Sequence, residues 1–228
     1  MGWKQDAVQR AVVSVYGCGG IGSQILLAGL KYGVRCLHAV DHDFVEVSNL
    51  NRQLFQLEDV GQPKAHALVR RLAPHGVMGS ELHGHPMYCQ EFFERFSALR
   101  PDAGVVGVDN DSARLAAARH HLAIARPVIC IALRDDAGGG LVFVQEPSKA
   151  CLGCYMGSVL GKRKAPCPGA PAVFDCCQVV CGYAAYALTS LLTKRPRSWN
   201  VLTIDLAGGE TRAHVVPRRR DCPLCSRV

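Results

Sequence analysis

The fold is decided by the stretch Ala11–Leu30, which reads AVVSVYGCGGIGSQILLAGL. It opens with a run of β-branched and apolar residues, Ala11–Tyr16, that is typical of a buried strand. The glycine-rich segment Gly17–Gly22 follows and leads into leucines and isoleucines at helical spacing. A second apolar run, Cys36–Val40, comes next. Together these segments predict one βαβ unit of about 30 residues.

Glycines recur through the turn of this unit, and an acid closes it. The spacing of Gly17, Gly19 and Gly22, with Gly20 between them, would let a phosphate group approach the backbone at the positive end of the following helix. Asp41 stands 19 residues beyond Gly22, where a carboxylate accepts hydrogen bonds from ribose hydroxyls. The alternative is that the glycines serve only tight packing. Up to this point NAD and ATP are equally compatible with the pattern.

The rest of the chain continues to alternate apolar runs with helical patterns. This alternation predicts an α/β fold with a Rossmann-like, doubly wound, mostly parallel sheet. A proline- and glycine-rich segment and paired cysteines, described below, add a crossover loop and a zinc-knuckle appendage to this prediction. We expect helices at Lys64–Ala73, Asp111–Ile124 and Val179–Leu192, and strands at Gly104–Val108, Val128–Leu133, Leu141–Gln145, Val201–Asp205 and Glu210–Val216.

The length of 228 residues suits one large domain. We divide it into a nucleotide-binding core at 11–145, a crossover loop at 146–175, and a C-terminal part at 176–228 that holds a helix, a hairpin and the second zinc knuckle. The segment 146–172 is rich in proline and glycine, and a loop of this length usually has a function.

The net charge of +7 favours a polyanionic ligand or an acidic partner. No aromatic residues are interleaved with the basic ones, so we do not expect nucleic-acid binding. The two uncharged stretches, Ala11–Leu30 and Cys176–Thr193, contain glycine and polar residues and read as buried elements rather than membrane spans. The first residues do not read as a signal peptide, so a cytoplasmic protein is expected. Twelve cysteines then suggest metal binding or thiol chemistry.

A second signature separates ATP from NAD. Residues Asp41–Phe55, DHDFVEVSNLNRQLF, and Gly61–Lys64, GQPK, resemble the adenylation signature of the ubiquitin-activating superfamily, the ThiF/MoeB/HesA-type proteins. The resemblance extends from Val12 to Cys225. It implies an adenylating enzyme that uses ATP and Mg²⁺, with a nucleotide site that includes these residues: Asp41 on the ribose, Asp43 beside it, and Asn49, Arg52 and Lys64 on the phosphates.

The residue types of this signature suit the chemistry. Arginine offers a planar fork and lysine a point charge, so Arg52 and Lys64 would neutralise a triphosphate whose α-phosphorus is attacked by a carboxylate. Asp109 follows a third buried strand, where ligands bind in open α/β sheets. It aligns with the magnesium-linked aspartate of the superfamily, although Val108 replaces the usual threonine before it. The alternative is a helix cap: the next residues, Asn110 and Asp111, also suit the start of the following helix.

Two C-x-x-C pairs, Cys151 with Cys154 and Cys222 with Cys225, are separated by 67 residues. Four thiolates in two such pairs suit a closed, tetrahedral, structural Zn²⁺ site, and the pairing matches the structural zinc of the superfamily. Redox thiols are the alternative. Cys36 is expected to be a small buried hydrophobe, and the histidines at 42, 83, 85, 120 and 121 show no spacing typical of metal ligands.

Cys167 lies in a stiff Pro-Cys-Pro segment just after Lys162–Lys164, whose charges would lower a thiol pKa. Superfamily members that form a thioester place their cysteine near this position, which makes Cys167 a candidate nucleophile and Cys176 the reserve. A loop cysteine of no consequence is the alternative.

The sequence therefore predicts ATP-dependent adenylation of the C-terminal glycine of a ubiquitin-like or sulfur-carrier protein, followed by a thioester on Cys167 or by direct transfer. A nucleotide-binding scaffold without chemistry is the main alternative, and NAD-dependent oxidoreduction leaves Arg52, Lys64 and the cysteine pairs unexplained. Only Met1–Arg10 precede the first strand, and the N-terminal arginine segment usual in the superfamily is missing. The missing segment argues against self-sufficient homodimeric catalysis, and it suggests that a fused or separate partner supplies the arginine or that the activity is reduced. The resemblance implies a homodimer or heterodimer, with a conjugating enzyme as a candidate further partner.

Overall fold

A computed structural model describes residues 3–157 and 172–226. Its strands are β1 Val12–Tyr16, β2 Cys36–Val40, β3 Glu81–His85, β4 Ala103–Val106, β5 Val128–Leu133, β6 Gly139–Gln145, β7 Val201–Asp205 and β8 Glu210–His214. Its α-helices are α1 Gln5–Arg10, α2 Gly20–Tyr32, α3 Lys64–Leu72, α4 Cys89–Arg95, α5 Asp111–Ala123, α6 Leu152–Met156 and α7 Phe174–Thr193. Three short 3-10 turns are η1 Val47–Asn49, η2 Leu57–Asp59 and η3 Ala73–His75.

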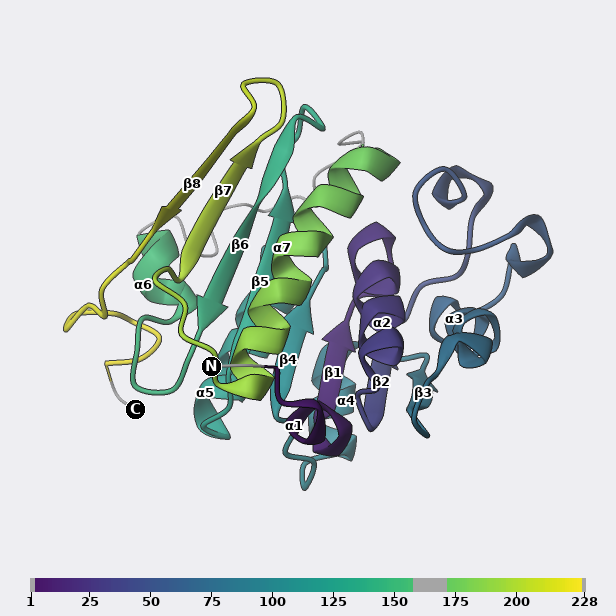
Figure 1. Cartoon of the computed structure of the whole chain (residues 1–228), viewed down its shortest axis with the longest axis horizontal. Helices are drawn as coiled ribbons and strands as arrows, with labels where there is room; N and C mark the ends of the chain where they lie inside the picture. Colours follow the sequence, from purple (N-terminus) through teal and green to yellow (C-terminus); the bar gives the residue numbers. More distant parts are fainter. Residues whose placement is uncertain (1–2, 158–171, 227–228) are drawn as a thin grey trace.

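The eight strands form one sheet in the order β3-β2-β1-β4-β5-β6-β7-β8 (Figure 1). β3, β2, β1, β4 and β5 are parallel, whereas β6, β7 and β8 are joined to them and to one another in antiparallel pairs. The predicted Rossmann-like, mostly parallel sheet is confirmed. The sheet ends in β3 on one side and in β8 on the other.

Helices cover both faces of the sheet, and each face has its own apolar core. α2, α3 and α7 pack on one face, with α2 and α7 side by side (Figure 1). α4, α5 and α6 pack on the other face, around the buried side chains of Tyr16, Phe92 and Phe143. Because helices cover both faces, the residues that follow the ends of the strands lie at the two rims of the sheet, outside these cores.

The glycine turn between β1 and α2 forms as predicted. Gly17 has a φ of +92°, in the left-handed region that favours glycine. A Cβ on Gly22 would lie 1.7 Å from the carbonyl oxygen of Gly17, so only glycine allows the helix to start this close to the strand. The result is an open backbone turn at the amino end of a 13-residue helix.

Several elements differ from the expected ones. β3 and α4 were not predicted, because the segment of β3, ELHGH, lacks an apolar run and every residue in it is half-buried or exposed. α7 begins at Phe174, five residues before the predicted start, because Cys176 and Cys177 are already buried in its first turn. Cys36 was expected to be buried but is partly exposed at the start of β2.

Among the described residues α7 alone is long and apolar enough to cross a membrane by length and composition. Of the apolar window that passes this test, 61% is buried inside the protein. It packs against α2 and against β5 and β6, as a core helix does.

Candidate functional site

A cavity of about 680 Å³ opens at the carboxyl ends of the parallel strands. This rim is where ligands bind in open α/β sheets. The cavity is lined by most of the residues predicted for the nucleotide site: Gly17, Gly19, Gly20, Asp41, Asp43, Asn49, Arg52, Lys64 and Asp109. Gly22 is not in the lining, and its role is the close packing of α2 on the turn.

Asp41, directly after β2, is held by two backbone groups. Its Oδ2 accepts a hydrogen bond of 2.6 Å from the amide of Cys18, and its Oδ1 accepts one of 2.8 Å from the amide of Asp43. Burial raises the pKa of this carboxyl, although both amide hydrogen bonds oppose the shift. The carboxylate is therefore fixed beside the glycine turn, with its orientation set by the main chain.

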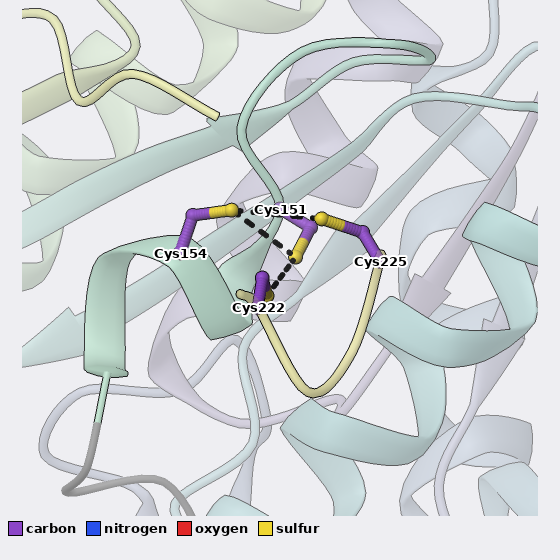
Figure 2. A group of neighbouring side chains, drawn as sticks. All are labelled: Cys151, Cys154, Cys222 and Cys225. Carbon is purple, nitrogen blue, oxygen red and sulfur yellow. Dashed lines mark hydrogen bonds between the residues drawn. The ribbon is translucent and has the colours of Figure 1, made fainter. Parts of the chain in front are cut away.

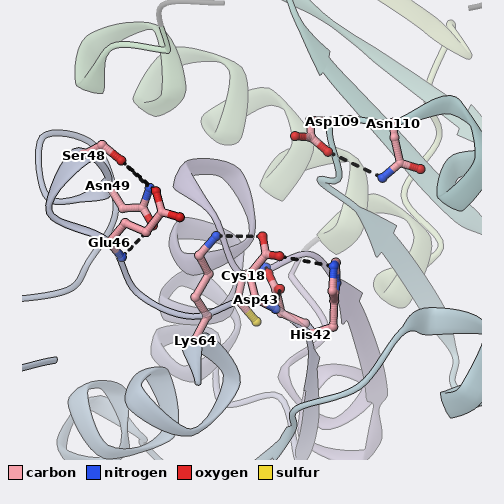
Figure 3. Close-up of polar contacts among 10 residues, drawn as sticks. Cys18, His42, Asp43, Glu46, Ser48, Asn49, Lys64, Asp109 and Asn110 are labelled. Carbon is pink, nitrogen blue, oxygen red and sulfur yellow. Dashed lines mark hydrogen bonds and ion pairs between the residues drawn. The ribbon is translucent and has the colours of Figure 1, made fainter. Parts of the chain in front are cut away.

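Lys64 reaches the cavity because the GQPK segment pairs with the segment after β2. Phe44 and Pro63 form an isolated bridge, and the amide of Lys64 donates to the carbonyl of Asp43 over 2.9 Å. The Nζ of Lys64 then lies 3.0 Å from Oδ2 of Asp43 (Figure 3). Lys64 is 8% exposed, so this cation is positioned by the protein rather than free in solvent.

Asn49 is the last residue of η1, and Arg52 lies on the loop between η1 and η2. Asn49 is buried, and its Oδ1 accepts a hydrogen bond from the amide of Glu46 (Figure 3). The Nη1 of Arg52 donates to the carbonyl of Ser48 over 2.8 Å and to Oδ1 of Asn51 over 2.9 Å. Both acceptors are neutral, and within residues 3–157 and 172–226 no carboxylate forms an ion pair with Arg52. The guanidinium charge is therefore available to an anion.

Asp109 lies on the segment that follows a separate strand, β4. Its Oδ1 lies 3.5 Å from Nδ2 of Asn110, a long contact (Figure 3). Asn110 itself caps α5, because its Oδ1 accepts a hydrogen bond of 2.8 Å from the amide of Ala113. The capping alternative raised by the sequence thus applies to Asn110 and leaves the carboxylate of Asp109 at the cavity wall.

Three further cavity residues were not identified from the sequence. Tyr88 stacks on His42 with ring centroids 3.9 Å apart, and both rings line the cavity. Gln53 is buried, and its Oε1 has no hydrogen-bond partner in the described part of the chain. Cys177 also lines the cavity, and burial raises its pKa to about 11. Tyr88 and Cys177 belong to no recognisable motif, so only the folded arrangement identifies them.

The four paired cysteines come together in the apolar core on the face of the sheet that α4, α5 and α6 cover. The sulfur atoms of Cys151 and Cys222 are 3.5 Å apart, those of Cys154 and Cys225 are 3.6 Å apart, and those of Cys151 and Cys154 are 3.8 Å apart (Figure 2). All four are buried, and their sulfur atoms lie within 4.8 Å of one another. Sulfur ligands about 2.3 Å from a tetrahedral Zn²⁺ are about 3.8 Å apart, so these spacings fit that ion.

The thiols of this cluster differ in acidity. Burial would raise the pKa of Cys222, but hydrogen bonds from the amides of Leu224 and Cys225 and from neighbouring thiols bring it down to about 7. Burial raises the pKa of Cys151. One member of the cluster is therefore poised to be a thiolate, which is the form that binds a metal.

The structure gives a position for only one of the two candidate nucleophiles, Cys176. Cys167 lies outside the described residues. Cys176 is fully buried, its thiol donates to the carbonyl of Gly139 over 3.3 Å, and burial raises its pKa. In this conformation Cys176 has neither the exposure nor the thiolate character of a nucleophile.

Known proteins share both the sequence and the fold. The profile of the ThiF family matches residues 3–224. A sulfur carrier protein adenylyltransferase of Thermus thermophilus is 32% identical over 97% of this chain and 84% of its own length. A NEDD8-activating enzyme E1 catalytic subunit of Arabidopsis thaliana is 35% identical, and its match covers 50% of this chain but 25% of its own length.

Solved structures agree on the architecture. A crystal structure of E. coli MccB with ATP superposes with a TM-score of 0.79 over 97% of this chain and 68% of MccB, at 20% identity. A second crystal structure of MccB, with MccA-N7isoASN, gives a TM-score of 0.80 over 97% of this chain and 69% of MccB, also at 20% identity. The fold is therefore shared, and the family match extends over nearly the whole chain. The chain belongs to the ThiF family.

Proposed function

We propose that this protein binds ATP and Mg²⁺ and adenylates the C-terminal glycine of a small sulfur-carrier or ubiquitin-like protein, releasing pyrophosphate. The observation that supports this most is the convergence, at one cavity, of Asp41, Arg52, Lys64 and Asp109 from separate segments of the chain. The relatives named above include a sulfur carrier protein adenylyltransferase and a NEDD8-activating subunit.

Each side of the cavity suits a different part of ATP. The carboxylate of Asp41 accepts hydrogen bonds from the ribose hydroxyls, as its fixed orientation favours. The stacked rings of His42 and Tyr88 give a flat aromatic surface for adenine. The glycine turn at the start of α2 offers backbone N–H groups to a phosphate. The side-chain oxygen of Gln53, which has no partner in the described part of the chain, accepts a hydrogen bond from the bound ligand.

The chemistry needs cations rather than a protein nucleophile. An oxygen of the partner's terminal carboxylate attacks the α-phosphorus, a new phosphorus–oxygen bond forms, and the bond to the bridging oxygen breaks as pyrophosphate leaves. Lys64 and Arg52 neutralise the charge that develops on the phosphate oxygens. Lys64 exchanges its contact with Asp43 for the phosphate. Asp109 presents the hard oxygen ligand that Mg²⁺ prefers, and the ion, when bound, would offset phosphate charge.

The partner's tail has a route to the nucleotide. A second cavity of about 340 Å³ lies along the ends of β5, β6, β7 and β8, and it shares Ala132 and Leu133 with the nucleotide cavity. Its walls are mixed, because Arg134, Asp205 and Arg212 line it together with apolar residues. We infer that an extended C-terminal tail enters here, and that its carboxylate meets the α-phosphate where the two cavities join.

We infer that Cys151, Cys154, Cys222 and Cys225 bind one structural Zn²⁺. Their sulfur spacings suit a tetrahedral ion, and no ligand position would remain open for catalysis. The ion would tie the segment after β6 to the C-terminal segment.

We further propose that the acyl group passes to Cys167 as a thioester, and direct transfer to an external acceptor is the rival. The sequence around Cys167 supports the first route, and the burial of Cys176 disfavours the reserve candidate. In intact-mass spectra with ATP and the partner, we expect a thiol-sensitive adduct that Cys167→Ala abolishes and Cys176→Ala retains. Pyrophosphate exchange without an adduct in any variant would favour direct transfer.

The adenylation step is tested by exchange of radiolabelled pyrophosphate into ATP, with candidate partner proteins added one at a time. Exchange that depends on a partner with an intact C-terminal glycine supports the proposal. Calorimetric titration with ATP and with NAD is the second measurement. Tighter binding of NAD than of ATP would contradict it, and ATP binding without exchange would leave the scaffold alternative in its place.

A further inference from the structure

Metal-ligating side chains gather at the edge of the sheet away from both sites described so far. β2 and β3 pair in register, with Cys36 opposite Glu81 and His38 opposite His83, and His85 follows on the same face of β3. Side chains alternate along a strand, so these five point to one face of the sheet. No local pattern indicates this cluster, because the two strands are far apart in the chain.

The other face of the same strands is the apolar one. Leu37 is fully buried against α2, where a Cβ on Gly29 would meet its side chain, and a Cβ on Gly84 would meet the backbone of α3. On the face of the cluster, Phe92 of α4 packs against the rings of His38 and His85, with centroids 6.0 Å and 4.9 Å away. The polar row is therefore held on one side by α4 and open to solvent on the other.

The spacing of the donor atoms suits a small divalent ion. Nε2 of His83 lies 3.2 Å from Oε2 of Glu81, and Sγ of Cys36 lies 3.5 Å from Nε2 of His38. Ligand atoms of Cys36, Glu81 and His83 all lie within 4.8 Å of one another. Ligands of a tetrahedral Zn²⁺ are separated by about 3.4–3.6 Å for nitrogen, oxygen and sulfur donors, so these three donor atoms are close enough to share one ion.

A hydrogen-bonded histidine lies directly beside the proposed sulfur ligand. Nδ1 of His38 lies 3.0 Å from Nε2 of His85, and Nε2 of His38 lies 3.5 Å from Sγ of Cys36. If Nδ1 donates to His85, the other nitrogen of His38 faces the sulfur and can orient it from outside the ligand group.

We propose that Cys36, Glu81 and His83 form a second metal site, for a zinc-class divalent ion whose remaining coordination position is filled by water. The mixture of sulfur, nitrogen and oxygen donors suits Zn²⁺ and related ions rather than Mg²⁺ or Ca²⁺, which prefer oxygen alone. The Cys36 thiol, whose pKa is raised by burial, loses its proton to solvent as the sulfur–metal bond forms. The bound ion joins the edge strand β3 to β2.

This site is separate from the nucleotide cavity. Cys36 and Glu81 are the first residues of their strands, whereas Asp41 follows the last residue of β2. The ion would therefore lie toward the amino ends of the parallel strands and would not replace the Mg²⁺ expected beside Asp109. The proposal is tested by measuring metal content and metal affinity. Neither measurement depends on adenylation activity.

The test is a Zn²⁺ titration of the metal-free full chain against a chromophoric chelator. We expect Cys36→Ser and His83→Ala each to bind one ion fewer than the wild type. Cys222→Ser keeps the second ion, and the exposed His75→Ala serves as the matched control with wild-type stoichiometry. Wild-type stoichiometry in both Cys36→Ser and His83→Ala would overturn the proposal.

Because Cys36 is partly buried, a substitution confined to the surface keeps the test independent of folding. Glu81→Gln removes a carboxylate ligand at an exposed position and should weaken the second ion at least about tenfold. Thermal unfolding of each metal-free variant, compared with the wild type, confirms that the chain is folded. An unchanged affinity in Glu81→Gln would remove this residue from the site and contradict the assignment.

Discussion

The parallel strands β1–β5 and the antiparallel strands β6–β8 place their reactive side chains in opposite environments. In the parallel half, Asp41, Arg52 and Asp109 line an open cavity, and backbone groups hold Asp41 and Arg52 there. In the antiparallel half, the sulfur atoms of the four paired cysteines are buried and contact one another. Mutation of the charged residues at the cavity and mutation of the buried thiols should therefore affect different properties of the protein.

This difference leads us to expect separate effects on activity and on stability. Substitution of the exposed cavity residue Asp109 should reduce activity and leave the unfolding temperature almost unchanged, because exposed charges contribute little to stability. Substitutions in the cysteine cluster should reduce stability first, because a metal bound only by the folded chain adds its binding free energy to folding.

The largest effect should come from Asp109→Ala. We expect it to lower pyrophosphate exchange about a thousandfold or more, because the variant loses the oxygen ligand proposed for Mg²⁺ beside the phosphates. Its thermal unfolding should match that of the wild type. Asp6→Ala, at an exposed position on α1, is the matched control. Undiminished exchange in Asp109→Ala would remove this carboxylate from the site.

Cys222→Ser should produce the largest loss of stability. We expect the variant to lose the ion shared with Cys151, Cys154 and Cys225 and to become less stable by about 4 kcal/mol or more. Elemental analysis and chemical denaturation measure the two quantities. Cys89→Ser is the control, since that thiol is also buried but donates to the side chain of Gln90. Full retention of zinc in Cys222→Ser would show that the cluster is not the metal site.

Lys64→Ala should reduce exchange about a hundredfold, because one of two cations beside the phosphates is removed while Arg52 remains. The loss should appear mainly in kcat if Lys64 acts on the charge that develops at the phosphates, and mainly in KM for ATP if it only binds the ground state. Lys194→Ala, at an exposed helix end, is the control. An equal loss in both variants would point to a general effect of net charge.

The smallest effect concerns the pH dependence of stability. Burial lowers the pKa of His121 to about 3, well below about 6.5 for an exposed histidine. The unfolded chain therefore binds a proton that the folded chain refuses, and this part of the stability is complete above pH 6.5 and is lost as the pH falls toward 3. We expect a slope of about 1 kcal/mol per pH unit between pH 6 and 4.

Denaturation of the metal-free wild type and of His121→Gln at several pH values measures this slope. The variant should show the smaller slope, because glutamine has no proton to gain. His38 and His85 shift in the same direction and contribute equally to both proteins, so the difference between the two slopes isolates His121. Equal slopes would show that His121 does not titrate as its burial requires.

Local patterns made the central part of the fold predictable. The run from Ala11 to Leu30 places apolar residues, glycines and helical spacing in sequence, and β1, the turn and α2 follow in the structure. The edge strand β3 could not be found in this way, because its segment ELHGH has no apolar run and pairs only with β2. An edge strand is specified by its neighbour more than by its own residues.

The same distinction applies to the sites. Asp41, Asn49, Arg52 and Lys64 belong to contiguous motifs, and the structure brings all four to one cavity. The cluster of Cys36, Glu81 and His83 depends on the register of two strands, which no local pattern in either segment reveals. Tyr88 and Cys177 likewise reach the cavity through long-range packing. Whether the motif residues hold the nucleotide as proposed is for the exchange assay to decide.

The two open borders of the sheet have a consequence for solubility. A terminal strand offers unpaired backbone groups that can recruit another chain and start aggregation. β8 is exposed along its whole length, and Glu210, Arg212 and His214 alternate along it, while β3 presents Glu81 and His83 to solvent. Ionisable groups at alternate positions on both borders oppose strand-to-strand stacking of separate molecules. In the described part of the chain, the charges on β3 and β8 therefore disfavour pairing of a terminal strand with another molecule.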